Sequence, residues 1–126
     1  SLGRGGFLAM AGTTSISNDT ATLEAEQMPN SSALFYQGTA RVNGGAGNVF
    51  GDGLRCAQGT IIRLATKMNV LGKSQFPEGN DPLLHVRGGV TVGALRTYQV
   101  WYRNAADFCT PSTFNLTNGV EVTWVP

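Results

Sequence analysis

The sequence predicts an all-β fold, an antiparallel β-sandwich of about eight or nine strands, with a jelly roll as one arrangement of them. Seventeen glycines and five prolines, together with many Thr, Asn and Ser residues, divide the chain into short segments. Several segments alternate apolar and polar residues, as half-buried strands do. At 126 residues the chain has the size of one domain, so we assign residues 1–126 to a single unit.

The charges are few and balanced, with nine Lys and Arg residues against eight Asp and Glu residues, a net charge of +1. A nucleic-acid surface needs a concentrated basic patch, so we expect no nucleic-acid partner. No apolar run approaches the ~18 residues of a membrane span, so none is expected. The chain opens at Ser1 without an initiator Met. We therefore expect a fragment or a processed product, with any signal peptide removed or far upstream.

The first half of the chain contains three expected strands. Residues 7–11 form a short apolar run after a glycine-rich lead-in. Residues 20–28 alternate loosely, which favours a strand, although Ala and Glu also suit a helix. Residues 33–42 are rich in apolar and aromatic side chains, and residues 43–48, with three glycines, must form a loop.

The second half continues in the same way. Residues 60–66 predict a strand, residues 72–82 are polar and predict a loop, and residues 83–92 predict a strand interrupted by Gly88 and Gly89. Residues 120–125 alternate throughout. We therefore expect Val122 and Trp124 to lie in or near the core.

Residues 97–103 are the clearest strand, with three aromatic residues and neither Gly nor Pro. Successive side chains of a strand point to opposite faces. The expected core face carries Tyr98, Val100 and Tyr102. The other face carries Thr97, Gln99, Trp101 and Arg103. Its mixture of an indole, an amide and a guanidinium suits either a polar second face or a binding surface.

Cys56 and Cys109 are the only cysteines, and neither has a cysteine or histidine partner at metal-binding spacing. A disulfide is the leading interpretation, with two buried free thiols as the alternative. It would stabilise the fold by about 4 kcal/mol through restriction of the unfolded chain. Disulfides persist outside the cytoplasm, so we expect a secreted, extracellular protein.

A disulfide would also bring charged residues from two segments together. We expect them to form a structural network of ion pairs, with a polar binding pocket as the alternative. The candidate members are Asp52, Arg55, Arg63, Arg103 and Asp107.

Four motifs together resemble a module found at the C-terminal end of large secreted proteins from planctomycete-like and myxobacterium-like bacteria. The motifs occupy residues 34–38, 50–56, 98–103 and 114–119, and the similarity extends over residues 8–126. The resemblance implies secretion, an accessory role and a C-terminal position. It implies no catalytic residues.

Catalysis finds little support in the sequence. His85, the only histidine, would have to be the base of any Ser-His-Asp triad, and no GxSxG motif is present. A hydrogen-bonded structural histidine is the default interpretation. The eight acidic residues follow no glycosidase pattern. We therefore expect a non-catalytic protein, with a small hydrolase as a distant alternative.

Glu78, Asn80 and Asp81 place three oxygen-bearing side chains within four residues, as a calcium loop can. They do not match an EF-hand, and a solvated turn explains the same residues. We expect no cofactor, with structural calcium as the alternative.

Carbohydrate binding uses aromatic rings together with planar polar groups. Two groups of residues are candidates: Gln99, Trp101 and Arg103 on one strand, and Tyr36 with Gln37 on another. The alternative is that Trp101 packs in the core. We predict a non-catalytic secreted accessory module that binds a polysaccharide or cell-surface glycan. The competing function is C-terminal anchoring, sorting or docking to sibling domains of a larger protein.

Overall fold

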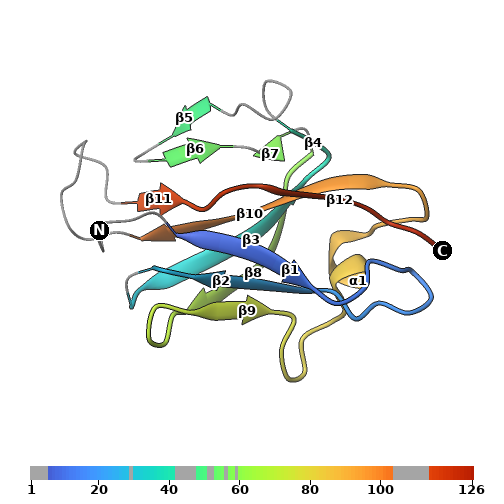
Figure 1. Cartoon of the computed structure of the whole chain (residues 1–126), viewed down its shortest axis with the longest axis horizontal. Coiled ribbons are helices and arrows are strands. Elements are labelled where there is room, and N and C mark those ends of the chain that lie inside the picture. Colours follow the sequence, from blue (N-terminus) through green and yellow to red (C-terminus); the bar gives the residue numbers. More distant parts are fainter. Residues whose placement is uncertain are drawn as a thin grey trace.

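The computed structural model describes residues 6–28, 30–41, 48–50, 53–55, 57–58, 60–103 and 114–126 (Figure 1). These residues form twelve strands and one short helix, α1 (Leu84–Gly88). The strands are β1 (Phe7–Ala11), β2 (Thr22–Glu26), β3 (Ser32–Gly38), β4 (Ala40–Arg41), β5 (Asn48–Phe50), β6 (Gly53–Arg55), β7 (Ala57–Gln58), β8 (Ile62–Met68), β9 (Ser74–Phe76), β10 (Leu95–Arg103), β11 (Phe114–Leu116) and β12 (Val120–Thr123). The predicted all-β class is confirmed. The strands outnumber the eight or nine expected because several are only two or three residues long.

The strands form two main antiparallel sheets. The first has three strands in the order β1-β2-β9. The second has the order β11-β10-β3-β8, and β12 also pairs with β10. The remaining strands form two small pairs, β4-β7 and β5-β6. In Figure 1, β5, β6 and β7 lie at the top, β10 to β12 in the middle, and β2 and β9 at the bottom.

One apolar core joins the two main sheets. The three-stranded sheet contributes Leu8, Leu23, Ala25 and Phe76. The larger sheet contributes Ala33, Phe35, Leu64, Tyr98, Val100 and Tyr102. Trp124 is fully buried in the same cluster, and Val122 packs against it half-buried. The core positions predicted from the alternation in residues 97–103 and 120–125 are therefore confirmed.

The opposite face of β10 is also covered over part of its length. Thr97 and Gln99 are buried there, and Tyr36 with Leu116 forms a second small apolar cluster. Trp101 and Ile61 pack against that cluster half-buried. The middle of β10 is therefore covered on both faces, and only its ends reach solvent.

Two predicted elements differ from the structure. Residues 83–92 contain the helix α1 where a strand was expected. Gly89, with a φ of 61°, ends that helix in a left-handed C-cap that favours glycine. Leu84 and Val90 anchor the segment in the core. Residues 72–82, expected to form a loop, contain β9, which a tight turn through Leu71 and Gly72 connects to β8. Among the described residues, no helix is long and apolar enough to cross a bilayer.

Side chains satisfy backbone groups along two sheet edges. At β1, the Leu8 N–H donates to Asn118 Oδ1 at 2.8 Å, and Asn118 Nδ2 donates to the Leu8 carbonyl at 2.9 Å. At β8, Arg87 donates from Nε to the Leu64 carbonyl at 3.0 Å and from Nη2 to the Arg63 carbonyl at 2.7 Å. Such caps remove hydrogen-bonding groups that another strand would use.

Candidate functional site

Three of the five residues predicted to bind a ligand are buried. Gln37 and Gln99 have no exposed surface, and Tyr36 retains 6%. The Tyr36 hydroxyl donates to Gln99 Oε1 at 2.7 Å. Gln99 Nε2 donates to the Thr117 carbonyl at 2.6 Å, and Gln37 Nε2 donates to the Gly88 carbonyl at 3.1 Å. These side chains hold the protein together internally and do not reach a ligand on the surface.

The other two predicted ligand residues lie toward the end of β10. Trp101 is half-buried against the cluster formed by Tyr36 and Leu116, and Arg103 is exposed. The face expected to bind glycan is therefore reduced to its last two residues. Their role in binding a ligand stays a prediction.

The disulfide and most of the charged network predicted around it fall outside the described residues. This applies to Cys56, Cys109, Asp52 and Asp107. The backbone of Arg55 lies in β6, while its side chain is not among the parts of the chain that the structure describes. Two further candidates are exposed on the second sheet, Arg63 on β8 and Arg103 on β10.

Two of the three calcium candidates, Glu78 and Asp81, pair with a lysine. Lys67 Nζ bonds Asp81 Oδ2 and lies 3.6 Å from Glu78 Oε1, while Asn80 is exposed. This hydrogen bond holds the pKa of Asp81 below its ordinary value and raises the pKa of Lys67. Within the described part of the chain, no three His, Cys, Asp or Glu side chains converge as metal ligands would. An ion pair thus takes the place considered for calcium.

His85 lies on α1 and is bonded to a buried carboxylate. Its Nδ1 is 2.7 Å from Asp19 Oδ2, which also accepts the His85 backbone N–H at 2.9 Å. Asp19 Oδ1 accepts the Ala21 N–H at 3.0 Å, and the Asp19 side chain has no exposed surface. The contacts tie the loop before β2 to the helix, which supports the structural interpretation. Sequence reasoning missed Asp19 because it lies 66 residues from its partner.

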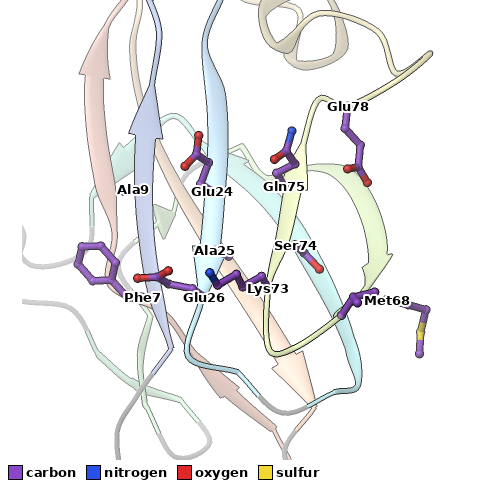
Figure 2. Close-up of a pocket in the computed structure, with 11 residues that line it drawn as sticks. Phe7, Ala9, Glu24, Ala25, Glu26, Met68, Lys73, Ser74, Gln75 and Glu78 are labelled. Carbon is purple, nitrogen blue, oxygen red and sulfur yellow. The ribbon is translucent and has the colours of Figure 1, made fainter.

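A groove of about 380 Å³ lies on the outer face of the three-stranded sheet (Figure 2). Alternation along the strands places Leu8, Leu23 and Phe76 in the core and their neighbours outside. The outward positions that line the groove are Phe7, Ala9, Glu24, Glu26 and Gln75. The last residue of β8, Met68, lines one side together with Val70 and Lys73 of the turn that leads to β9.

The groove is arranged in rows across the sheet. Ala9 pairs with Glu24 and Glu24 pairs with Gln75, so a methyl group, a carboxylate and an amide follow one another. In the next row Phe7 pairs with Glu26. The small Ala9 side chain leaves the floor low between taller neighbours.

Apolar side chains flank these polar groups. The Phe7 ring is 45% exposed, and Met68 and Val70 are about 70% exposed (69% and 70%). Figure 2 shows Phe7 and Met68 at opposite sides, with the polar ends of Glu24 and Gln75 turned the same way. The arrangement offers apolar surface beside planar hydrogen-bonding groups. The loose alternation in residues 20–28 set Glu24 and Glu26 on one face, but only the pairing of β2 with β1 and β9 brings them beside the other groove residues.

Comparison with protein-family models, curated proteins and solved structures gives no significant match to this chain.

Proposed function

We propose that this chain is a secreted, non-catalytic β-sandwich module that binds carbohydrate through the groove on the outer face of β1, β2 and β9. The observation that carries the proposal is the combination of an exposed Phe7 ring with the Glu24 carboxylate and the Gln75 amide in one groove. The core shared by the two sheets supports a sandwich arrangement. The proposed binding site is therefore not the face of β10 that the sequence suggested.

The chemistry of the groove suits a sugar ring. An aromatic ring offers an apolar plate to the C–H face of a pyranose. Carboxylate oxygens accept hydrogen bonds from hydroxyl groups, and the amide of Gln75 both donates and accepts them. The volume of about 380 Å³ falls within the range of small-ligand sites, roughly 300–1,000 Å³.

Affinity electrophoresis on a panel of polysaccharides tests the proposal. We expect the intact domain to be retarded by at least one polysaccharide and the Phe7→Ala variant to lose that retardation. Because Phe7 is 45% exposed, the melting temperature of the Phe7→Ala variant should differ little from that of the unaltered domain. Val92→Ala removes a similarly exposed apolar side chain outside the groove and serves as the control. Migration unaffected by every polysaccharide would contradict the proposal, and so would retardation that survives Phe7→Ala.

Export and the disulfide belong to the same proposal. The resemblance to modules of large secreted bacterial proteins supports secretion and a C-terminal position. The two cysteines, Cys56 and Cys109, suit an oxidising compartment. Mass spectrometry of unreduced protein should show two hydrogens fewer than the dithiol. Two alkylatable thiols in native, air-exposed protein would contradict this part of the proposal.

A second function, docking to a sibling domain, is favoured by a different surface. Val92, Leu95 and Val125 are each about half exposed (55%, 46% and 47%). They lie near one another because Leu95 pairs with Thr123 and the Gly93 N–H donates to the Trp124 carbonyl. In the parent protein, Val92→Asp should then expose the neighbouring domain junction to protease. Unchanged protection would argue against docking here.

A further inference from the structure

We propose that the groove on the outer face of β1, β2 and β9 selects glycans that carry free, protonated amines over neutral and anionic glycans. The inference rests on the proposed function and adds the chemical class of the ligand. It follows from the charges that line the groove and from the capped edge of β1.

Carboxylates outnumber cations in the groove. Among the described residues that line it, Glu24, Glu26 and Glu78 stand against one cation, Lys73. Glu78 lies 3.6 Å from Lys67 Nζ and is partly neutralised there. Within the described residues, Glu24 and Glu26 have no cation within ion-pair distance. Figure 2 shows Lys73 extending toward Glu26, while the Glu24 carboxylate is turned away from Lys73.

A ligand with amines matches this lining better than one with hydroxyl groups alone. Ionised carboxylates only accept hydrogen bonds, whereas an ammonium group donates three. Hydrogen bonds between two charged groups are roughly twice as strong as neutral ones. Glu24 and Glu26 are two residues apart on one face, which places them about 7 Å apart along β2. Two amines of a single oligosaccharide can therefore meet two carboxylates.

The edge of the sheet argues against an extended basic peptide as the ligand. Extended peptides commonly bind by adding a strand to an open edge. At β1, the edge position beside the groove is occupied, because Asn118 bonds both the N–H and the carbonyl of Leu8. Charge of like sign also opposes anionic membranes and a second copy of the same groove. A ring-shaped cationic ligand that lies on Phe7 remains the best match.

Calorimetric titration with two matched oligosaccharides tests the inference. The first is a hexamer of glucosamine in slightly acidic buffer, which keeps its amines protonated, and the second is the hexamer of N-acetylglucosamine in the same buffer. We expect the intact domain to bind the glucosamine hexamer about tenfold more tightly. Added salt should shrink this preference, because it screens exposed charges.

Variants assign the preference to the two carboxylates. In the double variant Glu24→Gln with Glu26→Gln, we expect the two hexamers to bind with similar affinity. Glu121→Gln on β12, outside the groove, is the matched control and should keep the tenfold preference. Should the double variant fail to fold, the salt dependence of the unaltered domain still decides the question.

The outcomes separate this inference from the proposed function. Equal affinity for the two hexamers would overturn the selectivity and leave glycan binding in place. No binding to either hexamer or to any polysaccharide would overturn both. A hexamer of lysine that binds as tightly as the glucosamine hexamer, and loses affinity in the same double variant, would overturn the glycan assignment in favour of a basic peptide.

Discussion

The hydroxyl of Tyr98 donates to Oε1 of Gln37 at 2.9 Å across the pairing of β10 with β3. The same hydroxyl accepts from Trp124 Nε1 at 3.0 Å, and Gln37 Nε2 donates to the Gly88 carbonyl at 3.1 Å. One chain of hydrogen bonds thus links Trp124, just after β12, with β10, β3 and α1 inside the core. Burial raises the pKa of Tyr98 far above its ordinary value, which keeps the hydroxyl protonated as a donor.

Replacing Tyr98 with Phe should destabilise the protein by roughly 1–3 kcal/mol, because it leaves buried polar groups of Gln37 and Trp124 without a partner. Urea denaturation measures the change. Tyr102→Phe is the matched control. Its hydroxyl accepts the N–H of Gly6, a half-buried residue that water can reach, so we expect a smaller loss. Equal losses in the two variants would contradict the importance of the buried chain.

Gly88→Ala should destabilise the protein by roughly 2–3 kcal/mol, because overpacking and a broken buried hydrogen bond act together. A Cβ at Gly88 would lie 2.2 Å from Gln37 Oε1. Gly89→Ala is the control, since a Cβ there meets nothing within 4 Å. Its left-handed backbone alone should cost about 1 kcal/mol. Thermal denaturation that ranked the two variants in the reverse order would exclude this close approach.

Trp124→Ala should cost ~3–5 kcal/mol of folding free energy, because the side chain is fully buried. Trp101→Ala removes a half-buried indole and should cost less, roughly 1–2 kcal/mol. The Trp101 variant also tests where a glycan binds. If its retardation by polysaccharide disappears while its melting temperature is unchanged, the binding site lies at the end of β10 and not in the groove.

The Lys67–Asp81 pair should contribute about 0.5–1 kcal/mol of stability at neutral pH, as partly exposed pairs do. The folded-state pKa of Asp81 lies below its unfolded value of 3.8, so this contribution is present above that pH and is lost as pH falls through the folded value. Lys67 has its pKa raised above 10.5, so its contribution is lost only as pH rises through the raised value. Urea midpoints between pH 7 and pH 3 should fall less steeply for Asp81→Asn than for Glu24→Gln. If the urea midpoints of the two variants fell equally with pH, a stabilising Lys67–Asp81 pair would be contradicted.

Local patterns in the sequence predicted the parts of the fold that depend on alternation. Tyr98, Val100 and Trp124 were placed correctly because each belongs to a strand-like run with a clear apolar face. The strand predicted around His85 was wrong, because a five-residue helix and a short strand differ little in sequence pattern. The contact that ties this helix to the loop before β2 comes from Asp19, far away in the sequence. Polarity alone did not reveal β9.

The candidate site was harder to predict than the core. Gln99 was expected on a binding surface because it is polar and lies beside Trp101. Its burial depends on neighbouring strands and on Tyr36 and Thr117, which supply its hydrogen bonds. The groove depends on the pairing of three strands, and one of them lies in a segment that looked like a loop. No periodicity within one segment carries that information.

The hydrogen bonds between Leu8 and Asn118 also set an order of events during synthesis. The two residues are separated by 110 positions, and further along the same segment the Ser15 hydroxyl bonds the Pro126 carbonyl across 111. Residues 6–16 therefore leave the ribosome long before the residues that they bond in the folded protein. Contacts of such long separation slow folding. Until they form, the apolar side of β1 and its unpaired backbone groups are open to other nascent chains, and chaperone protection would matter most in that interval.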